Sequence, residues 1–67
     1  MAKIQLNGKK TIIKANLSVG DLVKKYKLKE SNIAIEINGV ILPKNKYNKK
    51  RLRTNDKIEI VQFIGGG

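Results

Sequence analysis

Alternating apolar and polar residues divide the start of the chain into two short extended segments. Ile4 and Leu6 alternate with polar neighbours, and a second extended pattern runs from Lys9 to Ala15. The dipeptide Asn7-Gly8 separates the two segments, and both residue types tolerate the positive φ angles of a type I′ turn. The pattern therefore predicts a β-hairpin at the N-terminus.

A helical period replaces this alternation after residue 17. Ser18 is a suitable N-cap, and Asp21 stands three residues later, where the acid of a capping box belongs. Apolar residues then recur at positions i, i+3, i+4 and i+7, which places them on one face of a helix. We expect a short helix that lies on a sheet through this face, with Tyr26 at the edge of the core. The four residues of the face are Val19, Leu22, Val23 and Tyr26.

The next segment is extended again. Three isoleucines between residues 33 and 37 alternate with less apolar residues, as in a half-buried strand. A second Asn-Gly pair at 38–39 turns the chain into a short apolar segment at 40–42. Pro43 cannot donate a hydrogen bond to a neighbouring strand. We therefore predict that the segment at 40–42 is a brief strand at an edge of the sheet.

The last part of the chain contains a loop and a strand. Residues 44–50 show no regular period, and we expect a solvated loop or a single 3₁₀ turn there, with Leu52 folding back. Turn-forming residues precede the last strand, which we place at residues 57–63. Both faces of this strand become apolar toward its end. We interpret the face turned away from the helix as a docking surface, anchored by Val61, Phe63 and Ile64.

The order of the predicted elements is β-β-α-β-β with the longest strand last, which is the order of a β-grasp (ubiquitin-like) domain of the α+β class. A mixed sheet of four to five strands with one main helix packed across one face is the smallest two-layer arrangement that buries these apolar faces. The first and last strands are then parallel neighbours. We assign residues 1–64 to the β-grasp domain and the glycines at 65–67 to a flexible C-terminal tail.

The composition argues against a self-sufficient enzyme. A chain of 67 residues has room for one core and no second lobe. The absence of Cys and His removes the commonest thiolate nucleophile, the side chain best suited to proton transfer at neutral pH, and the main soft metal ligands. We therefore predict no catalytic side chain and no metal site. The acidic residues are scattered without the spacing of metal ligands: Asp21, Glu30, Glu36, Asp56 and Glu59.

The formal net charge of +10 raises the possibility of a nucleic-acid-binding module. Only Arg51 and Arg53 among the basic residues are arginines, and the aromatic residues that stack on bases are scarce. We therefore favour a solvated surface over a nucleic-acid partner as the explanation of the charge. Without Cys, a signal peptide or a membrane-spanning apolar segment, we expect a soluble cytoplasmic protein without a membrane partner.

Several motifs along the whole chain resemble one family. The ending Phe63-Ile64-Gly65-Gly66-Gly67 and its terminal Gly-Gly are the most specific of them. The chain resembles the ThiS family, the sulfur-carrier proteins of bacterial thiamin biosynthesis. The other motifs are Leu6-Asn7-Gly8, the helix start Ser18-Val19-x-x-Leu22, the segment from Ile35 to Pro43, and Asn55-Asp56-Lys57-Ile58.

This resemblance implies a carrier on which partner enzymes act. An adenylyltransferase of the ubiquitin-activating type (ThiF-like) would use ATP and Mg²⁺ to adenylate the carboxylate of Gly67. A cysteine desulfurase route would supply sulfur, and the Gly67 thiocarboxylate would donate it to a thiazole synthase (ThiG-like). Gly65 and Gly66 would form the rest of the tail, and the carrier itself would bind no cofactor.

Three alternatives remain open at this point. The small subunit of molybdopterin synthase and the ubiquitin-like modifiers share the fold and the glycine ending. A modifier would form an isopeptide bond with a lysine of its target. The third alternative, a basic β-grasp nucleic-acid-binding module, rests on the net charge alone.

Overall fold

The predicted N-terminal hairpin is confirmed by the computed structural model, which describes residues 1–63. Strand β1 (Ala2–Leu6) pairs antiparallel with β2 (Lys9–Ile13). Between them, Asn7 and Gly8 have φ angles of 48° and 83°. The second Asn-Gly turn, at residues 38–39, repeats this geometry with φ angles of 53° and 85°. Asparagine and glycine enter this left-handed region at the lowest cost, so both turns form where the sequence predicts them.

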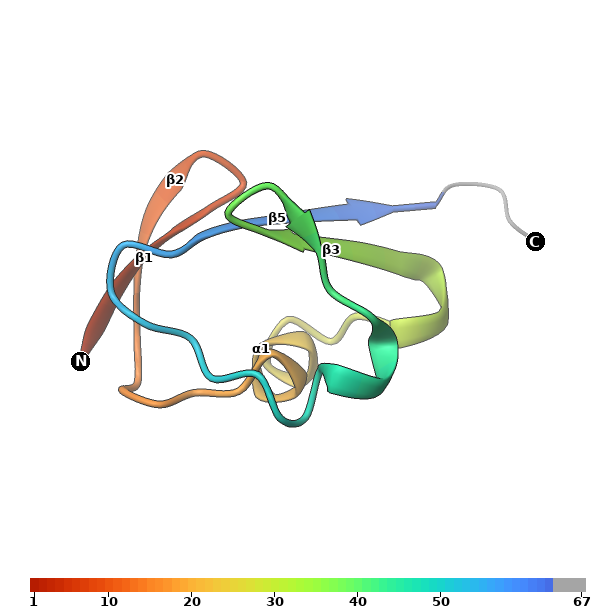
Figure 1. Ribbon diagram of the computed structural model, residues 1–67, viewed down its shortest axis with the longest axis horizontal. Helices are drawn as coiled ribbons and strands as arrows, with labels where there is room; N and C mark the ends of the chain where they lie inside the picture. Colours follow the sequence, from red (N-terminus) through yellow and green to blue (C-terminus); the bar gives the residue numbers. More distant parts are fainter. Residues whose placement is uncertain (64–67) are drawn as a thin grey trace.

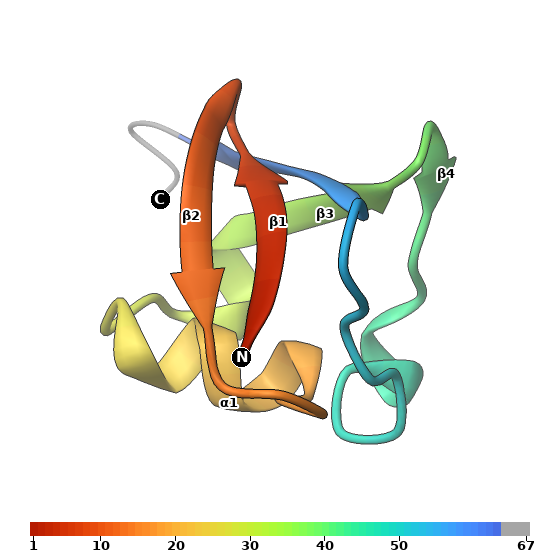
Figure 2. The ribbon, with the colours of Figure 1, turned by 90° about the vertical axis from the view of Figure 1, so that its left-hand side faces the viewer.

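Five strands form one sheet in the order β2-β1-β5-β3-β4. In the central position, β5 pairs in parallel with β1 and antiparallel with β3. Figure 2 shows β2 and the short β4 at opposite sides of this sheet. The predicted parallel pairing of the first and last strands and the edge position of β4 are both confirmed. The remaining elements of the sheet and its connections are β3 (Ile33–Ile37), β4 (Val40–Ile41), β5 (Lys57–Gln62), and the 3₁₀ turns η1 (Glu30–Asn32) and η2 (Lys44–Lys46).

Helix α1 (Val19–Lys25) covers one side of the sheet, and the opposite side carries no element among residues 1–63 (Figure 1). Its first turn contains the predicted capping box. The backbone N of Asp21 donates to Ser18 Oγ at 3.0 Å, and the backbone N of Ser18 donates to Asp21 Oδ2 at 3.4 Å. The Ser18 hydroxyl and backbone N–H lower the pKa of the Asp21 carboxyl below its usual value, because they bind its charged form.

The loop after η2 completes the N-terminus of α1. The N–H groups of Val19 and Gly20 donate to the carbonyls of Lys50 and Tyr47 at 2.9 and 2.8 Å. The first N–H groups of a helix have no acceptor within the helix, so the loop supplies what the helix lacks. The side chain of Tyr47 is only 2% exposed, and burial raises the pKa of its phenol. The prediction of a 3₁₀ turn is confirmed, whereas the prediction of a solvated segment is wrong at Tyr47.

The core lies between α1 and the sheet. The three isoleucines of β3 are buried and alternate with half-buried residues, as predicted. Leu52 folds back into this core, which is also as predicted. The helix and the sheet thus form the two-layer arrangement expected of a β-grasp fold. The buried apolar residues are Ala2, Ile4, Ile13, Val19, Leu22, Val23, Ile33, Ile35, Ile37, Tyr47, Leu52 and Ile58.

Both Asn-Gly turns hold β5 through their asparagines. Asn7 N donates to Ile58 O at 2.9 Å, and Asn7 Oδ1 accepts from Ile60 N at 2.7 Å. On the other side, Asn38 N donates to Lys57 O at 2.8 Å, and Asn38 Oδ1 accepts from Lys57 N at 2.9 Å. Each asparagine therefore adopts the positive φ of its turn and also binds the backbone of β5. The central strand is fixed from both neighbouring hairpins.

We expect Asn7→Gly to lower the free energy of unfolding by about 1 kcal/mol, because glycine keeps the positive φ but loses the side-chain acceptor for Ile60 N. Asn7→Ala adds left-handed strain and should cost about 2 kcal/mol in total. Urea denaturation measures both values. Asn55→Gly, at another position with positive φ, controls for the flexibility of glycine. Equal stability of wild type and both Asn7 variants would show that the hydrogen bond contributes nothing.

The lowered pKa of Asp21 predicts a pH dependence of stability. A carboxyl with a lowered folded-state pKa stabilises the fold above its unfolded pKa, and this contribution disappears as the pH falls through the folded value. Asp21→Asn should therefore melt at a lower temperature than wild type at pH 7. The difference should shrink as the pH falls below 3.8, the usual value for this group. Thermal melts of wild type, Asp21→Asn and the control Glu30→Gln test this, and a gap that stays constant with pH contradicts it.

Candidate functional site at the end of strand β5

Strand β5 supports the predicted site from the centre of the sheet. Its inward residues Ile58 and Ile60 face the core, where Ile58 is fully buried and Ile60 is half-buried. On one side β5 pairs with β3, and this pairing extends to the end of β5, where Gln62 lies opposite Ile33. One residue further, Phe63 N donates to Asn32 O at 2.8 Å. The chain is thus held by backbone hydrogen bonds up to the last residue that the structure describes.

The predicted docking residues of β5 lie on the face turned away from α1. Strand alternation directs Val61 to the side opposite Ile58 and Ile60, and the same alternation continued one residue past the end of β5 at Gln62 places Phe63 on that side too. Both Val61 and Phe63 are 56% exposed. The third predicted anchor, Ile64, lies outside the described residues. So do the predicted tail residues Gly65 and Gly66 and the predicted sulfur-carrying residue Gly67. Their roles stay predictions.

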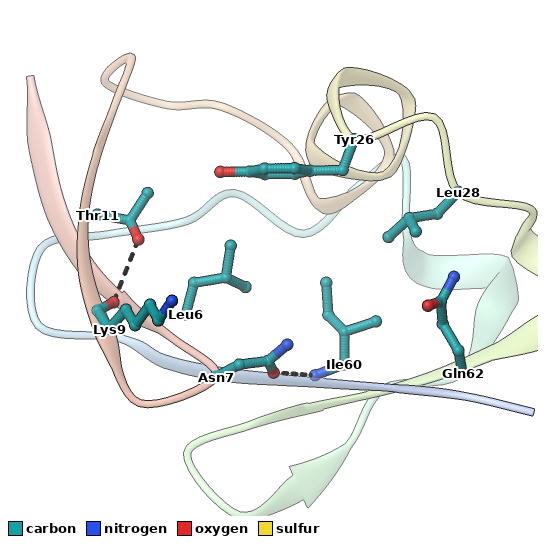
Figure 3. A pocket seen from close by; sticks show the side chains of 8 residues that line it. All are labelled: Leu6, Asn7, Lys9, Thr11, Tyr26, Leu28, Ile60 and Gln62. Carbon is teal, nitrogen blue, oxygen red and sulfur yellow. Dashed lines mark hydrogen bonds between the residues drawn. The ribbon is translucent and has the colours of Figure 1, made fainter.

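An open groove lies on the other face, between the end of α1 and the sheet (Figure 3), with a volume of about 440 Å³. Tyr26 lies above its floor of Leu6 and Ile60. The sequence predicts Tyr26 at the core edge, whereas in the structure α1 ends at Lys25 and the Tyr26 side chain is 42% exposed. The helical period alone did not show that the fourth apolar position falls beyond the helix. The groove is lined by Leu6, Asn7, Lys9, Thr11, Tyr26, Leu28, Ile60 and Gln62.

The described residues contain no cluster of three or more His, Cys, Asp or Glu side chains that could hold a metal ion. Two of the acidic residues have structural partners, because Asp21 closes the capping box and Asp56 accepts from Arg53 N at 2.9 Å and from Asn38 Nδ2 at 3.1 Å. Within residues 1–63, no helix has the length and apolar character needed to cross a membrane.

These features define a β-grasp protein whose central last strand leads toward a glycine-rich end. The model of the ThiS family matches residues 3–67. The chain is 38% identical over 65 residues to the sulfur carrier protein ThiS of Bacillus subtilis, with 96% of this chain and 98% of that protein covered. The chain belongs to the ThiS family.

Two further comparisons extend this result. The crystal structure of thiamine biosynthesis protein ThiS from Geobacter metallireducens has a TM-score of 0.83 at 25% identity, with 97% of this chain and 99% of that chain covered. The thiazole synthase of Paramagnetospirillum magneticum is 35% identical over 65 residues. That alignment covers 97% of this chain but only 20% of the synthase, so this chain spans about a fifth of that relative's length. The predicted family and fold are confirmed.

The exposure of Val61 predicts that it contributes little to folding stability. We expect Val61→Ala to change the free energy of unfolding by less than about 1 kcal/mol, since a solvent-facing side chain loses little packing. Ile35→Ala, on the buried face of the neighbouring strand, should cost about 2–5 kcal/mol. Urea denaturation of both variants gives the comparison. A cost at Val61 as large as that at Ile35 would show that this face is covered in the folded protein.

Proposed function

We propose that this protein is a sulfur carrier of thiamin biosynthesis and that the carboxylate of Gly67 carries the sulfur. The observation that supports this most directly is the family match, which extends through Gly67. The position of β5 agrees with it, because a strand fixed at the centre of the sheet gives the following residues a firm base. The site is then a backbone terminus, and the reactive side chains belong to partner enzymes.

A carboxylate must be activated before sulfur can replace one of its oxygens, because oxide is a poor leaving group. In the proposed sequence, a ThiF-like adenylyltransferase uses ATP and Mg²⁺ to form the Gly67 acyl-adenylate and release pyrophosphate. A persulfide from a cysteine desulfurase route attacks the acyl carbon and displaces AMP. A partner thiol then attacks the partner's sulfur in the resulting acyl disulfide, which forms a disulfide and releases the Gly67 thiocarboxylate.

The comparisons support a thiazole synthase as the sulfur acceptor. A segment similar to 97% of this chain forms about a fifth of a protein named thiazole synthase. We propose that a ThiG-like synthase receives sulfur from Gly67 of this protein. Glycine at positions 65–67 suits a narrow active-site entrance, because a Cβ would restrict φ and add width.

Docking in this proposal involves the exposed end of β5. Val61 and Phe63 present apolar groups on the uncovered face of the sheet, and Ile64 follows directly in the sequence. Exposed apolar groups next to a reactive terminus suit a partner that must hold the terminus in place. The net charge of +10 would speed encounters with acidic partner surfaces in a manner that depends on ionic strength.

Incubation with ATP, Mg²⁺, the adenylyltransferase and a persulfide donor should convert the protein to its thiocarboxylate. Intact-protein mass spectrometry should then show an increase equal to the mass difference between one sulfur and one oxygen, located by fragmentation at Gly67. Omission of ATP is the control and should leave the mass unchanged. The proposal fails if neither an adenylate nor the sulfur-containing species forms.

A variant with one alanine appended after Gly67 separates this site from the rest of the fold. It should melt at the wild-type temperature and remain unmodified, because the carboxylate is displaced from the position that the enzyme requires. Modification of the appended variant at the wild-type rate would show that the carboxylate of Gly67 is not the site of sulfur transfer. Covalent conjugates to lysines of other proteins, in place of a free thiocarboxylate, would indicate a modifier.

A further inference from the structure

Strand β2 has an open edge. Within residues 1–63 it pairs with β1 alone, and it stands at the end of the strand order. Residue pairs of antiparallel strands alternate between those that exchange backbone hydrogen bonds and those that do not. Gln5 N donates to Asp56 O on the other side of β1, so its partner Lys10 belongs to the second set, together with Ile12. The backbone N–H and C=O groups of Lys10 and Ile12 therefore point away from β1, in position to pair with a further strand.

The groove between the end of α1 and the sheet lies beside this edge (Figure 3). Lys9 and Thr11 of β2 line one end of the groove, and Gln62 lines the other end. The hydroxyl end of Tyr26 points toward the β2 end, and Leu6 forms the floor next to β2. Successive side chains of a strand point to opposite faces of the sheet. Alternate side chains of a strand added along β2 would therefore enter the groove next to Thr11.

The edge is apolar at its centre and basic at both ends. Thr11 and Ile12 form the centre, and the side chain of Ile12 is 58% exposed on the face opposite the groove. Lys9 and Lys10 precede these two residues and Lys14 follows β2, and all three lysines are exposed. Residues 1–20 contain no acidic residue, and none of the residues that line the groove is acidic. The edge therefore has the charge and apolar pattern that complements an acidic segment.

We propose that β2 binds an extended segment of a partner protein as an added strand, and that this segment has an apolar centre and acidic residues at both ends. Backbone hydrogen bonds to Lys10 and Ile12 give affinity, and side chains give specificity. The apolar side chains alternate between the groove and Ile12, and the acidic ends pair with the lysines. This inference does not depend on the sulfur-carrier function. Strand β1 separates the edge from β5, so the segment leaves Val61 and Phe63 uncovered.

Other occupants suit this edge less well. A second copy of the chain that paired β2 with β2 would place the lysines of one copy beside those of the other, which opposes association. Single-stranded nucleic acid would match the charge, but its bases stack on several aromatic side chains, and Tyr26 is the single aromatic residue that lines the groove. An acidic peptide segment satisfies the charge, the apolar centre and the outward backbone groups together.

A synthetic peptide with valines at its centre and glutamates at both ends, named here the acidic peptide, tests the inference on the full-length protein. Amide hydrogen exchange measured by NMR should show rapid exchange at Lys10 and Ile12 in the free protein. A free peptide concentration of about ten times the Kd should slow both amides about tenfold, because the bound strand accepts their hydrogen bonds. The control is the same peptide with N-methyl groups on the amides that face β2, which should not slow them.

Charge variants test the acidic ends of the segment. Lys9→Glu/Lys10→Glu should raise the Kd for the acidic peptide about tenfold or more, and it should bind a peptide with lysine ends more tightly than wild type does. Both variants should fold, because the residues paired with Lys9 and Lys10 are uncharged. The matched control Lys44→Glu/Lys46→Glu changes the net charge equally at exposed positions of η2 and should change the Kd less than about threefold.

Four results would overturn the inference. They are an acidic peptide that leaves exchange at Lys10 and Ile12 unchanged, equal binding of the N-methylated peptide, equal weakening by both charge variants, and displacement of the acidic peptide by a single-stranded oligonucleotide of lower Kd. Mass spectrometry of Gly67 tests the proposed function separately. Lys9→Glu/Lys10→Glu should still form the thiocarboxylate, whereas wild type that binds the peptide but never forms it would refute only the sulfur-carrier function.

Discussion

The backbone hydrogen bonding of β5 is the constraint on which the rest of the structure depends. The strand pairs with β1 on one side and with β3 on the other, and the asparagine of each Asn-Gly turn adds a side-chain bond to it. Both hairpins are therefore joined through a strand that belongs to neither. Ile58 on its inward side completes the core, while Val61 on its outward side remains exposed. A single strand thus stabilises the core with one face and exposes the other face, which we propose as the docking surface.

The sequence was most informative where structure is set by neighbouring residues. The two Asn-Gly turns, the capping box of α1 and the alternation in β3 each depend on a few consecutive side chains, and all were predicted. The burial of Tyr47 was not predicted, because it depends on the contact between its loop and the N-terminus of α1. Carbonyls of this loop accept hydrogen bonds from the free N–H groups of the helix. The exposure of Tyr26 depends on where α1 ends. The register between β3 and β5, which neither segment reveals alone, places Glu36 directly opposite Glu59.

The same distinction applies to the candidate site. The sequence motif directs attention to Gly67, and the family match extends to that residue. A surface, by contrast, is assembled from several strands, so the exposed face around Val61 forms only in the folded sheet. The chemistry proposed for this protein needs no nucleophile or acid of its own. The demands on its own side chains are a stable base and a surface that partners distinguish, which small numbers of residues can meet.

The position of β5 also has a consequence for how the molecule forms. The bond from Ile60 N to Asn7 joins residues 53 positions apart, and the central parallel pair joins the two ends of the described chain. Such contacts close a long loop before they stabilise anything, which slows folding relative to a helical protein of this size. During synthesis on the ribosome, the N-terminal hairpin lacks its neighbour until β5 has emerged. The sheet and the proposed docking surface on it are therefore completed in the same late event, so an incomplete chain lacks the surface that we propose for partner enzymes.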